Sequence, residues 1–144
     1  MKTELCCLLA VTCLAVSLGG CGRDGSLKYE QAAASGVVTY KGEPVEEGLI
    51  RFIPDAVNDD GLTPGKPAFS KITKGIYEVP ADRGATVGKN RIEISSFRKT
   101  GRVIEEEGTK SEEKVQFLPA QYNTNSTLSA EVKPGENTLN FDLE

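Results

Sequence analysis

The chain has 144 residues, which is enough for one domain, and its 38% hydrophobic and 26% charged residues are typical of a folded globular protein. A formal net charge of −4 argues against a nucleic-acid-binding surface, because such a surface must neutralise phosphates. Histidine and tryptophan are absent. Since histidine is the most common general base near neutral pH, we expect a non-enzymatic protein without catalytic residues, metal site or cofactor.

The first twenty residues have the order of a secretory signal peptide. Lys2 supplies the basic start, an apolar run follows over residues 5–18, and two glycines end the segment. The apolar run is shorter than the ~20 residues that a membrane-spanning helix needs. We therefore expect residues 1–20 to be a cleaved signal.

The end of this segment resembles a bacterial lipobox, formed by Leu18, Gly19, Gly20 and Cys21. Small side chains admit the peptidase, and the thiol forms a thioether with a diacylglycerol. The other cysteines lie inside the apolar run: Cys6, Cys7 and Cys13. The mature chain then has one thiol and no internal disulfide, so we expect Cys21 to be lipidated and to bear palmitate-type acyl chains. The alternative is a plain secretory signal whose mature chain begins near a cysteine.

Residues 21–34 are polar and rich in small side chains, which predicts a flexible tether to a domain over residues 35–144. The three alanines at 32–34 allow a helical turn, but no periodic pattern supports a longer helix. Gly22 follows the cysteine, where an aspartate would favour retention in the inner membrane. We therefore expect a lipid-anchored, extracytoplasmic protein of the bacterial cell envelope, in the outer rather than the inner membrane.

From residue 36 onward, apolar residues recur with a period of two, which is typical of strands with one buried face. The runs are 37–40, 48–54, 68–72, 76–80, 90–96, 127–132 and 138–143. Run 68–72 is ambiguous, because its alternation can be read either way. Turn residues rather than helices separate the runs, so we expect an all-β fold, a single seven-stranded antiparallel sandwich of the immunoglobulin-like or transthyretin-like type.

The longest interruption covers residues 98–126. Residues 98–117 are charged and contain glycines, which predicts an exposed, mobile loop. The following residues carry enough apolar surface to dock on the sandwich. Among them, Leu118, Pro119, Tyr122 and Asn123 have two interpretations. The favoured one is structural, with Tyr122 packed on the sandwich and its hydroxyl and Asn123 holding backbone groups of the incoming strand, and the alternative is a recognition surface.

The stretch "GVVTYKGEPVEEGLIRF" resembles the start of a carboxypeptidase regulatory-like domain, a transthyretin-like β-sandwich. The matching residues are Gly36, Val38, Gly42, Pro44, Val45, Gly48, Ile50 and Phe52. Gly75 and Tyr77 are similar to the later glycine–aromatic hairpin of the family, although Lys74 stands where an acidic residue is common. The tail from "LPAQYN" onward, with the lipobox, resembles small planctomycete-type lipoproteins that consist of this one domain.

The resemblance implies a non-catalytic folding or binding module. Its partners would be the membrane, through the lipid on Cys21, and an envelope protein or wall component. Two other functions stay open. An assembly subunit would pair through an open sheet edge, which an exposed, uncharged edge strand would favour. An envelope hydrolase or transferase would need a nucleophile beside a lysine or carboxylate base in a concave pocket.

Four further patterns could each be a functional site or an ordinary structural feature, and we favour the structural interpretation for all four. The acidic turn at 55–61 fails the EF-hand spacing, so it is a solvated turn rather than a Ca²⁺ site. Lys41, Glu93 and Asn140 would be an isopeptide set, but the alternation puts two of them on the polar face. The carboxylates within 98–117 belong to a charged loop. The sequon at 125–127 is a turn.

Overall fold

The computed structural model describes residues 29–55, 57, 61 and 64–144, and within them the chain is all-β, as predicted. The strands are β1 (Gln31–Tyr40), β2 (Glu43–Pro44), β3 (Glu47–Pro54), β4 (Ala68–Thr73), β5 (Ile76–Val79), β6 (Ala85–Thr86), β7 (Gly88–Ser95), β8 (Phe97–Glu106), β9 (Thr109–Gln116), β10 (Ser129–Val132), β11 (Glu136–Thr138) and β12 (Phe141–Leu143). The helical segments of the described residues are two 3-10 turns, η1 (Ala81–Arg83) and η2 (Ala120–Tyr122).

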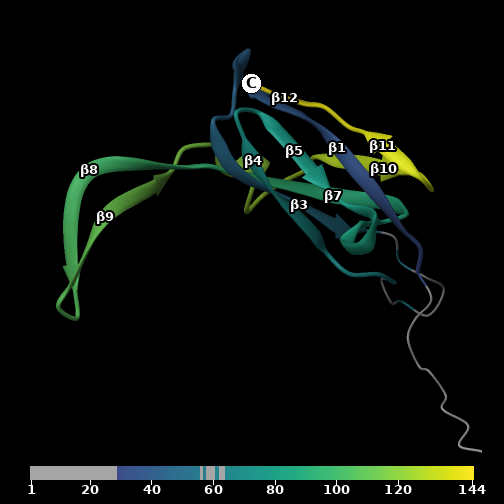
Figure 1. The fold of residues 1–144 in the computed structure, drawn as a ribbon, viewed down its shortest axis with the longest axis horizontal. Coiled ribbons are helices and arrows are strands. Elements are labelled where there is room, and N and C mark those ends of the chain that lie inside the picture. Colours follow the sequence, from purple (N-terminus) through teal and green to yellow (C-terminus); the bar gives the residue numbers. More distant parts are fainter. Residues whose placement is uncertain (1–28, 56, 58–60, 62–63) are drawn as a thin grey trace, which may run out of the picture.

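Ten strands form one sheet in the order β10-β7-β3-β4-β5-β1-β11, with β2, β6 and β12 also paired to β1 (Figure 1). Strands β10 and β11 follow each other in the chain but lie at opposite ends of this order, so the sheet curls around one core. The expected antiparallel pairing holds between β1 and its partners β2, β5 and β6, but β1 runs parallel to β11 and β12. The turn after β10 crosses to the far side of the core, and the chain then returns along β1.

Each of the seven predicted runs contains a strand with its apolar face toward the core, but run 138–143 is divided between β11 and β12, and β2, β6, β8 and β9 are strands that the sequence did not predict. Phe52, Ile50, Ile92 and Ile94 have no exposed surface, and Tyr77 is 1% exposed. The Tyr77 ring packs near the rings of Phe52 and Phe141, with centroids 5.9 and 6.3 Å away. Its hydroxyl donates a hydrogen bond of 2.7 Å to the carbonyl oxygen of Leu139, and burial raises the pKa of this hydroxyl.

The ambiguous run 68–72 is strand β4, and its register with β3 resolves which face is buried. Ala68 and Ile72 point inward and are 4% and 1% exposed, whereas Phe69 points outward and is 69% exposed. The larger side chain of this strand is thus on the solvent side. Period-two alternation alone cannot predict which face of this strand is buried, because it counts small and large apolar side chains equally.

The prediction of a tether ending at residue 34 is wrong for its last four residues, because β1 begins at Gln31. Ala32 and Ala34 are buried, with 2% and 1% exposure, so the helical turn suggested for this stretch is a strand. Ala34 pairs with Val79 on one side and Asn137 on the other. The small alanine side chain is buried in the core at this position between two strands, and it adds little volume there.

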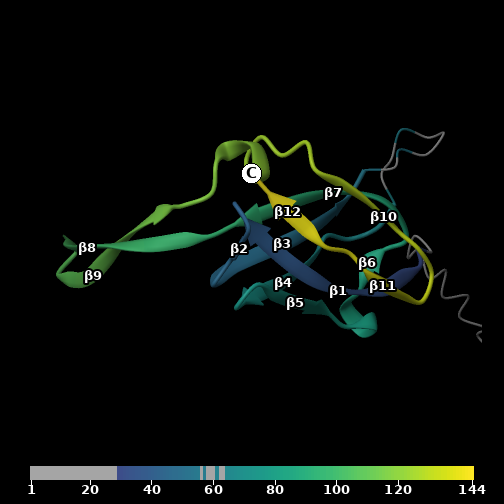
Figure 2. The same cartoon turned by 90° about the horizontal axis from the view of Figure 1, so that it is seen from above.

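The prediction of a loop over 98–117 is also wrong. Strands β8 and β9 form a two-stranded hairpin, called the arm here, that projects away from the curled sheet (Figures 1 and 2). Its tip, Glu107–Gly108, has φ of 49° and 79°, and Lys41–Gly42 and Lys74–Gly75 have nearly the same values. These are the positive φ angles of the tight turns that suit hairpins. The arm is exposed, as the charged composition predicted.

Among the described glycines, Gly36 has the closest backbone neighbour. A Cβ atom at this position would lie 2.0 Å from the carbonyl oxygen of Leu139. The N–H of Leu139 donates to Ser35, and the neighbouring Val37 N–H donates to the side-chain oxygen of Asn140. The glycine therefore lets the segment between β11 and β12 cross β1 at hydrogen-bonding distance.

Candidate functional site

The segment predicted to be either structural or a recognition surface lies against the core. Leu118 and Tyr122 are 3% and 8% exposed, whereas Pro119 is exposed and Asn123 is half-buried. The Tyr122 hydroxyl donates to the carbonyl oxygen of Glu144 at 2.6 Å and accepts from its N–H at 3.0 Å. One side chain thus joins η2 to the end of β12.

Asn123 closes the turn that holds Tyr122 in place. Its amide nitrogen donates to the carbonyl oxygens of Leu118 and Pro119, at 3.2 and 2.9 Å, and its side-chain oxygen accepts from Thr124. Both polar ends of the Asn123 side chain therefore bond within the segment. Tyr122 and Asn123 hold backbone groups, as the structural interpretation predicts, but these groups belong to residues 118, 119 and 144 and not to the incoming strand β10. Of the four residues, Pro119 is the exposed one.

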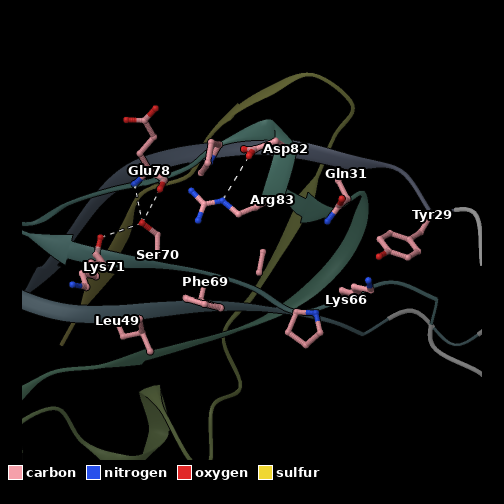
Figure 3. A pocket seen from close by; sticks show the side chains of 13 residues that line it. Tyr29, Gln31, Leu49, Lys66, Phe69, Ser70, Lys71, Glu78, Asp82 and Arg83 are labelled. Atoms are coloured by element: carbon pink, nitrogen blue, oxygen red, sulfur yellow. Dashed lines mark hydrogen bonds and ion pairs between the residues drawn. The ribbon is translucent and has the colours of Figure 1, made fainter. Parts of the chain in front are cut away.

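A groove of about 610 Å³ lies on the outer face of the sheet, over β4 and the neighbouring strands (Figure 3). Its apolar lining includes Tyr29, Leu49, Pro67, Phe69 and Pro80. Phe69 is the most exposed aromatic side chain among the described residues. The groove therefore presents a large apolar side chain to solvent, with strands on either side of it.

Charged side chains of both signs surround this apolar floor. Lys66 and Lys71 make no ion pair with another described residue, whereas Arg83 lies 3.8 Å from Asp82. The Ser70 hydroxyl donates to the backbone carbonyl oxygen of Glu78 at 2.7 Å, and the Glu78 residue itself is exposed (Figure 3). Two lysines and one carboxylate are thus available to polar groups of a ligand.

The groove continues toward the arm. A second hollow of about 320 Å³ shares Leu49 and Lys71 with it and reaches Phe97 and Lys114 at the base of the arm. Phe97 is 55% exposed. Together the two hollows, called the outer groove here, form one path that begins at Tyr29 and ends at the arm. Such an elongated path suits an extended chain better than a compact small molecule.

A third hollow, of about 430 Å³, lies on the other side of the base of the arm. It is lined by Tyr40 and Phe117, whose rings meet edge to face at 5.4 Å. The Arg98 guanidinium stacks over the Phe117 ring at 3.2 Å. This cation–π contact attaches the arm to the segment that carries Tyr122. The Phe117 ring on the wall of the hollow is therefore already in contact with the Arg98 side chain.

The other residue sets named from the sequence are not brought together as sites. Asp55 of the acidic turn pairs with Lys89 at 3.4 Å, and residues 58–60 lie outside the described part. Glu93 binds Arg51 and Arg91 on the outer face of the sheet. Over the described residues, His, Cys, Asp and Glu form no group of three with the spacing of a metal site.

Lys41 and Asn140, the other two residues of the isopeptide set, have contacts elsewhere. Lys41 is exposed in its turn with Nζ 5.3 Å from the Tyr40 ring centroid, whereas the Asn140 side chain accepts from the N–H of Val37. Neither is therefore engaged with Glu93. Ser126 of the sequon is buried and donates to the carbonyl oxygen of Ile92, which makes the sequon part of a turn against β7.

The carboxylates of the arm form ion pairs with cations of the arm. Glu112 lies 2.7 Å from Lys99, and Glu113 lies 3.7 Å from Arg102. The hydrogen bond to Glu112 raises the pKa of the Lys99 ammonium group. These groups are exposed to water, so they hold the two strands in register rather than creating an acid–base pair.

Leu18, Gly19, Gly20 and Cys21, the predicted lipobox, lie outside the described residues. Within the described part, no helix has the length and apolarity that crossing a membrane requires. The outer groove was missed by the sequence reasoning, since the alternation in 68–72 did not show that Phe69 faces outward. No family model, curated protein or solved structure matches this chain in the comparisons made.

Proposed function

We propose that this chain is a lipid-anchored, non-enzymatic β-sandwich module of the bacterial cell envelope that binds an extended segment of an envelope protein or wall component in the outer groove. The observation that carries the proposal is the exposure of Phe69, which is 69% exposed in the middle of that groove. Burying such a ring on binding would contribute about 1.5–3 kcal/mol. Lys66 and Lys71 supply cations beside it that form no ion pair with any other residue in the described part of the chain.

The sandwich and its family are part of the same proposal. The curled sheet with one core supports a transthyretin-like sandwich, and Gly36 and Gly48 support the carboxypeptidase regulatory-like resemblance. A Cβ at Gly48 would lie 2.7 Å from the carbonyl oxygen of Ser95, so both motif glycines stand where the backbone of another segment passes closely. Domain function in such a module comes from its surface and not from the fold itself.

Binding in the outer groove is tested by placing a photo-crosslinking amino acid at Phe69 in the full chain, in cells. Ile76 is the matched control, because it is 62% exposed on β5 and does not line the groove. We expect a discrete crosslinked product from position 69 that is weak or absent from position 76, and that Lys66→Glu with Lys71→Glu reduces. Equal products from both positions, or none from position 69, would contradict groove binding.

Lipid anchoring is tested separately by metabolic labelling with palmitate. We expect the wild-type chain and Cys13→Ser to take up the label and Cys21→Ser to lose it, because Cys21 alone follows the lipobox. Several acyl chains on one cysteine hold a protein stably at a membrane, whereas one chain does so marginally. Cys21→Ser should therefore also leave the membrane fraction or keep its signal. Label that survives this substitution would refute the lipid anchor, and separation of the two membranes by density tests the outer-membrane assignment.

A further inference from the structure

The arm is long for a hairpin that packs against so little. Each of its strands contacts chiefly the other, and its residues are exposed with the exceptions of Ile104 and Glu113, which are half-buried. An isolated two-stranded hairpin is marginally stable in water. Both outer edges of the arm also lack a neighbouring strand among the described residues. The arm therefore has the geometry of a surface that a partner covers.

Apolar side chains occur along the arm on both of its faces. Phe97 and Val103 are 55% and 63% exposed, and Val115 on the other face is 48% exposed. The ladder is regular except between Lys99 and Val103, where β8 has extra residues relative to β9. Such an irregularity bends a hairpin, and the arm bends partway along its length in Figure 1. The arm thus has an inner half next to the sheet and an outer half beyond the bend.

The charges of the arm are separated between these two halves. The inner half has the cations Arg98, Lys99, Arg102 and Lys114 against the carboxylates Glu112 and Glu113. The outer half has the carboxylates Glu105, Glu106 and Glu107 against the cation Lys110. One half therefore carries a formal charge of +2 and the other of −2, although the arm as a whole is neutral.

This separation is self-complementary. We propose that the arm joins two copies of this chain, antiparallel and related by a two-fold axis, so that the acidic outer half of each arm lies against the basic inner half of the other. In such an isologous contact each favourable charge pairing occurs twice. A parallel arrangement would instead set like charges side by side. Charges of both signs also oppose open-ended pairing with unrelated strands, because only one arrangement satisfies them.

Charge exchange between the halves tests this pairing. Lys99→Glu with Lys114→Glu makes the whole arm acidic, and Glu105→Lys with Glu106→Lys makes the whole arm basic. Each variant should repel itself, and the two should attract each other. The full chain of each, in a density-matched detergent, is analysed by sedimentation equilibrium, and far-UV circular dichroism checks that each variant keeps the wild-type spectrum. Lys41→Glu with Lys133→Glu is the matched control, because both lysines are exposed outside the arm.

We expect the wild-type chain and the control to be dimers, each arm variant alone to be a monomer with at least a tenfold weaker association, and the equimolar mixture of the two arm variants to form dimers. Raised salt should weaken the wild-type dimer, since exposed charges are screened. A monomeric wild-type chain at its highest soluble concentration overturns the proposal. So do arm variants that dimerise like the wild type, or a mixture that stays monomeric. Failure of pairing and failure of groove binding stay distinguishable, because Glu105→Lys with Glu106→Lys changes no residue that lines the outer groove, whereas Lys114 of the acidic-arm variant lines its end.

Discussion

Tyr122→Phe removes one hydroxyl group and keeps the aromatic ring. The hydroxyl makes two hydrogen bonds to the backbone of Glu144, one as donor and one as acceptor. The ring lies edge to face with that of Tyr40, with centroids 6.4 Å apart, and this contact survives the substitution. The change therefore isolates the connection between η2 and the end of β12.

The expected loss of unfolding free energy follows from these contacts. A neutral intramolecular hydrogen bond contributes about 0.5–1.5 kcal/mol net. Because Glu144 is exposed, water can replace both lost partners, and we expect Tyr122→Phe to cost about 1–2 kcal/mol in total. Tyr122→Ala also removes a ring that is 8% exposed, and a truncation of that kind costs about 3–5 kcal/mol.

Urea unfolding of the full chain, followed by far-UV circular dichroism, measures both costs. The transition midpoint should fall without a change in slope, because the buried surface is nearly the same. Tyr29→Phe is the matched control, since the Tyr29 hydroxyl forms no hydrogen bond with another described residue, and it should shift the free energy by less than ~0.5 kcal/mol. If Tyr122→Phe were as stable as the wild type but lost the crosslinked product at position 69, Tyr122 would be a recognition residue and the structural interpretation would be refuted.

Two further substitutions test the core. Gly36→Ala should cost at least about 2 kcal/mol in urea unfolding, because its Cβ would overlap the Leu139 carbonyl oxygen, whereas the neighbouring Ser35→Ala should cost less than ~0.5 kcal/mol; similar costs for the two would contradict the close approach. The raised pKa of Tyr77 means that folding favours the neutral phenol, so its contribution is complete below the ordinary tyrosine pKa of about 10 and is lost as the pH rises above it. Unfolding midpoints measured from about pH 8 to about pH 11 should fall more steeply for the wild type than for Tyr77→Phe, and parallel curves would disprove the assignment.

The strands were predictable because one face of each is apolar. Ile50 and Phe52, like Ile92 and Ile94, alternate with polar residues and are fully buried. The burial of such side chains is the main favourable contribution to folding, so a period-two pattern carries most of the information about the sheet. The local bonds of Asn123 were predictable in kind, because a turn asparagine satisfies its polar groups nearby. A hydrogen-bond partner for the buried Tyr122 hydroxyl was also predictable, but not that this partner is Glu144, 22 residues along the chain.

The arm was not predictable by the same reasoning, because neither face of it is buried. Its alternation is obscured where Thr100, Gly101 and Arg102 break the regular ladder, and its charges suggested a loop. The one local signal was Glu107–Gly108, which adopts the same positive φ angles as Lys41–Gly42. The prediction for Ala32 and Ala34 was wrong for another reason. Alanine has no strong strand signal of its own, and only pairing with distant strands places these residues in β1.

The outer groove and the arm meet at Lys114, which lines the groove's end and belongs to the basic inner half of the arm. If two arms pair as proposed, the acidic outer half of a second copy lies next to this end of the groove. A ligand that extends from Phe69 toward Phe97 would then meet the second copy, so binding and pairing should affect each other. Crosslinking at position 69 in the acidic-arm variant, compared with its mixture with the basic-arm variant, measures this effect. A change on mixing indicates coupling, and the same yield in both indicates that the ligand occupies only the half of the groove near Tyr29.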